Sequence, residues 1–262
     1  MIAARTTPSA RSEPTLLAYI IGELVLSRFV PAAIIGFIVA AKLTGLIRRL
    51  QASGPPDAPF LALPAYLLQQ GLTILFLAII VVLFVVRRPV IGKHSPVVGG
   101  LVALAGSFAL SVPVAGEVLE ENTSALFAST VFISVGVGFS VLSLIALGRC
   151  FGVMPEARGL VTSGPYSLVR HPLYVGETIS ALGLVMATAS FPYVGVFFVY
   201  CGLQYWRALN EEKALQEVFP EYEEYCRHTA RFLPSFHRLL RPAPALHSSH
   251  SKMSEGPARS IH

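Results

Sequence analysis

Charged side chains are scarce in this 262-residue chain, where Asp, Glu, Lys and Arg make up only 13% of the residues. An ordinary soluble domain carries about twice that share. The charges that exist are crowded into short stretches, and the hydrophobic residues, 53% of the chain, fall into long runs between them. A soluble chain of this length would still need a charged surface over its core. The scarcity of charge therefore indicates a polytopic membrane protein.

Cysteine pairs, metal-binding patterns and nucleic-acid-binding motifs are also lacking. Cys150, Cys201 and Cys226 stand far apart with no C-x-x-C pair, which argues against a disulfide framework or a thiolate metal site. The net charge of +5 is explained by the excess of Lys and Arg in cytoplasmic loops, without nucleic acid as a partner. Residues 1–12 lack the apolar core and cleavage site of a signal peptide, so we expect them to remain. We expect neither a metal nor nucleic acid as a partner.

Long uncharged runs predict the membrane spans. Three runs are long enough for the roughly 20 apolar residues that cross a bilayer: Ala58 to Val86, His94 to Gly116 and Asn122 to Gly148. A further candidate, Pro14 to Ile47, is interrupted by Glu23, Arg28 and Lys42. For that segment a helix lying in the membrane interface is the alternative to a span.

A helix hairpin is predicted in the C-terminal half. The apolar pattern that begins at Pro172 continues to Trp206 with Glu177 as the acidic residue inside it, which suits two short spans better than one. The break should fall at residues 189–192, where Ser190 and Pro192 favour a turn. The sequence thus predicts an all-α bundle of about six transmembrane helices, followed by amphipathic helices in the cytoplasm.

Six spans place both termini on the same side of the membrane. Because Lys and Arg mark cytoplasmic loops, both termini are assigned to the cytoplasm of a bacterium, with the protein in its inner membrane. Arg48 and Arg49 contradict this scheme, because they fall in a loop assigned to the other side. The basic residues that support it outside the tail are Arg5, Arg11, Arg87, Arg88, Lys93, Arg149, Arg158 and Arg170.

Charge density divides the chain into three predicted regions: transmembrane helices in 1–148, a catalytic core in 149–234 and a disordered tail in 235–262. Within the core, apolar residues recur at helical spacing between Arg207 and Ala230. Pro220 should split this stretch into one helix ending near Phe219 and a second beginning at Pro220. The histidines of the tail are interpreted as solvated, with metal binding as the less favoured alternative.

Two clusters of ionisable residues lie at the expected ends of the hairpin, where they are costly unless they pair or face water. In the first, Gly164 and Pro165 predict a turn, and Pro172 should open a helix with His171 just before it. In the second, Arg207 and Glu211 are four residues apart and share one helix face. The short hairpin should bring this pair back beside His171. Lipid anchoring, helix capping and simple pairing are the structural alternatives for these residues.

Two sequence blocks at the ends of the hairpin resemble the signature of the isoprenylcysteine carboxyl methyltransferase family. The first block reads LVTSGPY at 160–166 and RHPLYVG at 170–176. The second contains Arg207, EEKAL at 211–215 and RFLP at 231–234, in the order of that family's closing segment. The resemblance covers about residues 149–234, and the preceding spans carry no such signal.

The resemblance implies that S-adenosylmethionine binds between the cytoplasmic end of the hairpin and its flanking loops, while a lipophilic or lipidated acceptor enters from the bilayer. It implies that Glu211 completes the cofactor pocket and that Arg207 faces the acceptor carboxylate. The remaining implied cofactor contacts are Arg158, Gly159, Leu160, Val161, Tyr166, His171, Pro172, Leu173 and Tyr174. The chain departs from the family at Arg158, where another residue is often found, and residues 151–156 give no match to an upstream cofactor contact.

These residue types suit methyl transfer to a carboxylate. An ionised carboxylate needs no general base, so positioning carries most of the catalysis. An arginine can hold two carboxylate oxygens in a planar fork, and an acidic residue can bind polar groups of the cofactor. The lack of a Ser/His/Asp triad or a metal-ligand pattern is therefore expected.

Three other functions remain open from the sequence. Membrane sterol or enone reductases that use NADPH also carry a stretch like HPLYVGE at 171–177, but the EEKAL segment after Arg207 favours the methyltransferase. A phospholipid or amine N-methyltransferase would suit the same architecture. A non-enzymatic scaffold or transporter subunit is less favoured, because the spans lack paired intramembrane charges.

Overall fold

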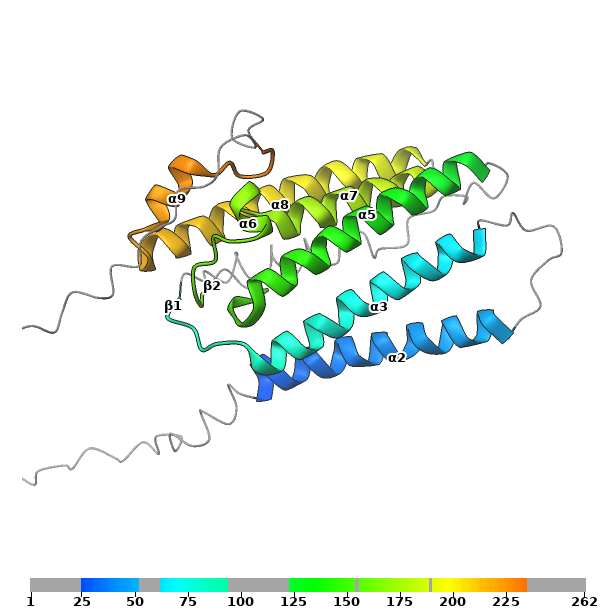
Figure 1. The fold of residues 1–262 in the computed structure, drawn as a ribbon, viewed down its shortest axis with the longest axis horizontal. Coiled ribbons are helices and arrows are strands. Elements are labelled where there is room, and N and C mark those ends of the chain that lie inside the picture. The colour runs from blue at the N-terminus through cyan, green and yellow to red at the C-terminus, as the bar shows by residue number, and fades with distance from the viewer. Residues whose placement is uncertain (1–24, 52–61, 94–122, 154–155, 189, 235–262) are drawn as a thin grey trace, which may run out of the picture.

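The computed structural model describes residues 25–51, 62–93, 123–153, 156–188 and 190–234 (Figure 1). The predicted span His94 to Gly116 and the predicted tail 235–262 lie outside these residues. Five long helices run roughly along one axis, so the described part of the chain is an all-α membrane helix bundle, as predicted. The helices are α2 (Val30–Gln51), α3 (Ala62–Val86), α5 (Thr123–Leu147), α7 (Pro172–Thr188) and α8 (Phe191–Val218).

Three described segments are long and apolar enough to cross a membrane: Ser27–Gln51, Pro64–Val86 and Ser124–Cys150. The last two coincide with spans predicted from the sequence. The first supports a helix in the uncertain N-terminal segment, although its helix continues through Arg48 and Arg49 to Gln51, past the predicted end at Ile47. A short π-helical turn, η1 (Val25–Phe29), precedes α2.

Helices α7 and α8 form the predicted hairpin. Pro172 is the first residue of α7, where a proline lacking an N–H is tolerated. Ser190 is extended and precedes α8, so the chain turns where the sequence predicted a break. The apolar part of α8 ends before Arg207, and the helix continues as a polar extension to Val218.

The end of α8 agrees with the prediction, whereas the start of the next helix does not. Phe219 is extended and caps α8. The following helix, α9 (Tyr222–His228), begins two residues after Pro220. Pro220 and Glu221 instead form a turn between the two helices, which the Tyr222 N–H closes by donating to the Phe219 carbonyl oxygen at 3.0 Å.

Small residues allow α5 and α7 to pack closely. A Cβ atom on Gly176 of α7 would lie 2.7 Å from the carbonyl oxygen of Gly136 on α5, and would also contact the Ser140 hydroxyl. Real Cβ atoms do not approach other atoms this closely. Close backbone approach through glycine and serine is typical of helix pairs in membranes, where water does not drive association.

The ends of α3, α5 and α8 and the start of α7 lie together at one end of the bundle, which we call the site end (Figure 1). Short elements connect them there. Strand β1 (Gly92–Lys93) pairs antiparallel with β2 (Glu156–Ala157), and α6 (Pro165–Leu168) precedes α7. A 3-10 turn, η3 (Gly148–Cys150), ends α5. A buried apolar cluster fixes these elements: Ala32, Leu83, Phe84, Leu144, Phe151, Leu173, Tyr174 and Ala208.

Candidate functional site

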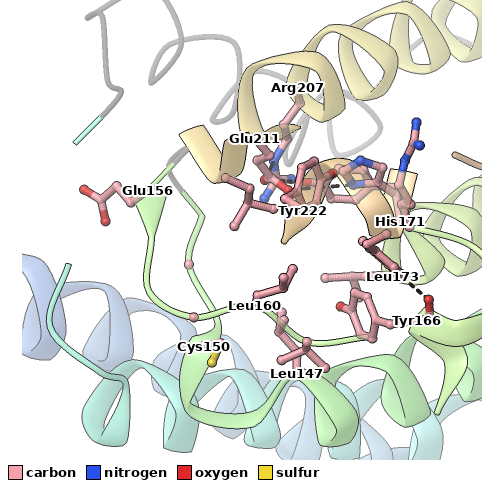
Figure 2. Close-up of a pocket in the computed structure, with 17 residues that line it drawn as sticks. Leu147, Cys150, Glu156, Leu160, Tyr166, His171, Leu173, Arg207, Glu211 and Tyr222 are labelled. Carbon is pink, nitrogen blue, oxygen red and sulfur yellow. Dashed lines mark hydrogen bonds and ion pairs between the residues drawn. The ribbon is translucent and has the colours of Figure 1, made fainter. Parts of the chain in front are cut away.

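A pocket lies at the site end between the loop after α5, the start of α7, the polar extension of α8 and helix α9 (Figure 2). Figure 2 shows Arg207 and Glu211 on one side of it and Leu147, Cys150 and Leu160 on the other. Its lining includes all the predicted site residues except Arg158 and Pro172. Those brought together are Gly159, Leu160, Val161, Tyr166, His171, Leu173, Tyr174, Arg207 and Glu211.

Glycines shape the loop wall of the pocket. A Cβ atom on Gly159 would lie 2.5 Å from the Cys150 sulfur, so the loop approaches the end of α5 more closely than a side chain allows. Gly164 has a φ of 61°, a left-handed conformation that favours glycine, and begins the turn into α6. The Gly164–Pro165 turn predicted from the sequence is thus confirmed.

Helix α6 supplies Tyr166 to the pocket. The hydroxyl of Tyr225 on α9 donates a hydrogen bond of 2.5 Å to the Tyr166 carbonyl oxygen, which fixes α9 against α6. Burial raises the pKa of the Tyr166 phenol, and the Glu211 carboxylate raises it further. This side chain is therefore a neutral polar group at physiological pH.

Arg207, Glu211 and Tyr174 form the polar side of the pocket. The Arg207 Nε atom lies 3.5 Å from Glu211 Oε1, which is the pairing that their four-residue spacing predicted. The guanidinium also lies over the Tyr174 ring, 4.7 Å from its centroid, and donates to the Val153 carbonyl at 3.3 Å. The Tyr174 hydroxyl donates to Glu211. The orientation of the Glu211 carboxylate is therefore fixed by its neighbours.

His171 joins this group from the start of α7, as the hairpin geometry predicted. Its Nδ1 atom lies 3.9 Å from a Glu211 oxygen, and its ring stacks on Tyr174 at a centroid distance of 5.3 Å and an interplanar angle of 6°. On its other edge, Nε2 lies 3.1 Å from Glu212 Oε1. His171 thus connects the pocket to the carboxylate behind it.

Glu212 is the centre of a buried ion network that the sequence did not reveal. Arg170 Nε donates to its Oε1 at 3.1 Å, and Arg231 donates to both oxygens at 2.9 and 2.8 Å. Backbone hydrogen bonds from Arg170 to Ala230 and from His171 to Arg231 hold the two chain segments side by side. The network therefore joins the two sequence blocks that carry the resemblance.

The electrostatics of Glu212 show that its charge is compensated. Burial alone would raise the pKa of this carboxyl, but hydrogen bonds from His171 and Arg231 and the charge of Arg170 lower the pKa to about 2. Sequence analysis singled out Arg170 and the EEKAL segment without assigning Glu212 a role. The sequence signal that was available is that Arg170, Glu212 and Arg231 all lie within the two blocks that carry the resemblance.

Arg158 and Pro172 are not among the residues that line the pocket. The Arg158 guanidinium donates to the Arg88 carbonyl and to Glu156, at 2.5 Å for the latter, so it fixes β2 to the chain after α3. Pro172 is fully buried at the start of α7. The residues that line the pocket do not include these two, so their cofactor contacts stay predictions.

A second polar cluster lies deeper in the hairpin. Gln204 is on the same face of α8 as Arg207 and Glu211, since the three are separated by three and four residues. Its amide nitrogen donates to Glu177 at 2.6 Å and to the Tyr200 hydroxyl at 2.9 Å. Polar groups therefore extend from the pocket into the apolar part of the hairpin.

Metal-ligating side chains do not gather in the described parts of the chain: no three His, Cys, Asp or Glu residues there are placed to hold an ion. The cysteines at 150, 201 and 226 are free thiols.

Two curated relatives match part of the chain. The cobalt-zinc-cadmium resistance protein CzcN of Cupriavidus metallidurans is 38% identical over 103 residues, and the nickel-cobalt-cadmium resistance protein NccN of Alcaligenes xylosoxydans xylosoxydans is 32% identical over 103 residues. Each match covers 37% of this chain and 48% of the relative. The chain thus spans about half the length of the curated relatives it matches.

The model of the phospholipid methyltransferase family matches residues 124–222, which run from the start of α5 to the start of α9. The match includes the loop, the hairpin and the polar extension of α8, which together provide most of the pocket. It confirms the family resemblance predicted from the two sequence blocks. Residues 124–222 of this integral membrane protein are therefore similar to the phospholipid methyltransferase family.

Proposed function

We propose that this protein transfers a methyl group from S-adenosylmethionine to a lipophilic, membrane-embedded acceptor, and that the acceptor group is a carboxylate. One observation carries the proposal: Arg207 and Glu211 share a single pocket with the 159–161 loop and the start of α7, within a methyltransferase family segment. The acceptor is proposed to be a small lipid or a lipidated chain that reaches the pocket from the bilayer of a bacterial inner membrane.

The residues of the pocket fit this cofactor. Glu211 provides a carboxylate for hydroxyl or ammonium groups, and Leu147, Leu160 and Leu215 provide apolar surface for a flat ring. Gly159 has no side chain, so the backbone of its loop is accessible at the pocket wall. When bound, S-adenosylmethionine supplies a methyl group activated by a positive sulfur.

Arg207 is proposed to position the acceptor. Its guanidinium is held between the Tyr174 ring and the Glu211 carboxylate, at the point where α8 leaves its apolar part. A planar guanidinium can hold a carboxylate through two parallel hydrogen bonds. Because the acceptor carboxylate is already ionised near neutral pH, the residues around it need only hold it in line and exclude water.

The names of the two relatives suggest a biological setting for the same reaction. Methyl esterification converts a carboxylate, which is a good ligand for divalent cations, into a neutral ester. Methylation of an acidic membrane component is therefore our proposed route by which this chain would contribute to metal resistance, a property stated in the names of CzcN and NccN.

Calorimetric titration of the purified full chain tests the cofactor assignment. S-adenosylmethionine and S-adenosylhomocysteine should bind, and saturating ligand should raise the unfolding temperature, because it binds the native state selectively. NADPH should produce neither effect. Binding of NADPH with no response to S-adenosylmethionine would instead support the reductase alternative.

A further inference from the structure

Five arginines surround the end of α3 at the site end of the bundle. Arg28 lies in η1, Arg87 and Arg88 follow α3, Arg149 lies in η3, and Arg158 follows β2. Sequence analysis used most of these residues only to orient the chain, and the proposed methyl transfer does not use them. They come from four separate segments, so the fold and not the local sequence brings their charges together.

Backbone carbonyls hold four of the five guanidiniums. Arg28 donates to Val85 at 3.2 Å and Arg149 donates to Val86 at 3.0 Å, at the last residues of α3. Arg158 donates to the Arg88 carbonyl. The carbonyl end of a helix attracts cations, but its partial charge of about half a unit cannot neutralise several of them.

Among the residues that the structure describes, the cluster therefore keeps an excess of positive charge. Within the described ranges, Glu156 is the carboxylate that pairs with it, through Arg158. Arg87 and Arg158 are only 7% and 5% exposed, and the Nε atom of each is buried without a hydrogen-bond partner among the described residues. The Nη2 atom of Arg87 donates to the Ser27 carbonyl at 2.5 Å. Buried cations without a matching anion are costly.

The charges act on one another. Burial lowers the pKa of Arg87, and the positive charges of Arg158 and Arg28 lower it further. The negative charge of Glu156 raises this pKa, but the result is still about 10. The exposed side chains of Arg88 and Arg149 flank these buried groups at the surface. An anion beside Arg88 and Arg149 would compensate the whole cluster.

We infer that this arginine cluster binds the phosphate group of an anionic membrane lipid, with Arg88 and Arg149 as the accessible contacts. The lipid source is favoured over free phosphate, because the cluster lies where the apolar helix α3 ends and the polar loops begin. Arginine is suited to phosphate because its planar fork can make two parallel hydrogen bonds. The cluster shares no arginine with the pocket, although Arg88 Nη1 would lie 3.5 Å from a Cβ atom built on the pocket residue Gly159.

Lipid titrations of the full chain in detergent micelles test the inference. Wild-type protein should bind short-chain phosphatidylglycerol more tightly than phosphatidylcholine. Arg88→Gln combined with Arg149→Gln should weaken phosphatidylglycerol binding about 30-fold, on the basis of about 1 kcal/mol for each basic residue near an anionic lipid. The single change Arg88→Gln, which leaves the bond from Arg149 to Val86 intact, should give about a fivefold loss.

Arg48→Gln combined with Arg49→Gln provides a matched control, because it removes two exposed arginines at the far end of α2 (Figure 1). Its lipid affinity should stay within about twofold of wild type. Equal losses from both double variants, or no preference for phosphatidylglycerol in the wild type, would overturn the inference. Inorganic phosphate that competes at a similar concentration would overturn the lipid assignment in favour of a free anion.

Discussion

Replacing Glu212 with alanine is expected to lower the free energy of unfolding by about 3 to 5 kcal/mol, the usual cost of removing one partner from a buried ion network. The change leaves Arg170, His171 and Arg231 facing one another without their shared carboxylate. A denaturant titration of the purified protein in detergent measures the effect. Since Arg170 and Arg231 hold two distant segments together, the loss should also loosen the pocket.

Glu224→Ala is the matched control for this change. Glu224 is an exposed carboxylate of α9 that pairs with the exposed side chains Arg227 and His228. Removing an exposed pair partner should cost no more than about 1 kcal/mol. If Glu212→Ala were no more destabilising than Glu224→Ala, Glu212 would not have the central role assigned to it.

Acid sensitivity offers a second readout of the same network. The pKa of Glu212 is about 2 in the folded protein, below the ordinary value of 4.5 expected in the unfolded chain. Its stabilising contribution is therefore present above pH 4.5 and is lost as the pH falls toward 2, by about 3 kcal/mol in total. In Glu212→Gln the loss of stability at low pH should shrink by that amount. If stability still fell with pH as it does in the wild type, Glu212 would not be the group responsible.

Replacing Glu211 or Arg207 with alanine should impair different steps of the reaction. Glu211→Ala would remove the charge-assisted hydrogen bond that we propose Glu211 makes to the cofactor, worth about 1.5 to 3 kcal/mol, and should weaken S-adenosylmethionine binding about 10- to 150-fold. Arg207→Ala should lower turnover and the kcat/KM for the acceptor while cofactor affinity stays within a few-fold. Calorimetry and steady-state kinetics separate the two outcomes.

Two conservative changes sharpen this comparison. Arg207→Lys keeps the positive charge but loses the planar fork, so it should restore little activity if the acceptor is held by two hydrogen bonds. Tyr174→Phe keeps the ring beneath Arg207 but removes the hydroxyl that donates to Glu211. It should therefore weaken cofactor binding and spare the acceptor step. Equal, small effects of all these variants would contradict the proposed site and would indicate that Arg207 and Glu211 only form an ion pair on the helix surface.

The helix hairpin and its pocket were predictable because their signals are local. Pro172 opens α7, the 189–192 segment holds the break, and the four-residue spacing of Arg207 and Glu211 gives their pairing directly. The boundary of the first span was harder, because Glu23 and the arginines nearby obscure the apolar pattern. The start of α9 was misplaced because Pro220 suits a turn as well as the first turn of a helix.

The contacts that sequence analysis missed are all long-range. Glu212 looked like part of a charged helix face, and only the bridge between Val169 and Ala230 brings Arg170 and Arg231 onto it. Arg158 was assigned to the cofactor through the family resemblance, yet β1 and β2 turn its side chain toward the end of α3. Neither pairing follows from spacing, because the segments concerned are many residues apart.

Transfer of labelled methyl groups tests the central claim most directly. Purified full-length protein would be incubated with S-adenosylmethionine labelled in its methyl group and with a membrane lipid extract, and label in organic-soluble product would be counted. The wild type should produce a base-labile labelled product, as a methyl ester does, and Arg207→Ala should produce little or none. Label that never leaves the cofactor fraction, or a product formed equally well by Arg207→Ala, would contradict the proposed reaction and its site.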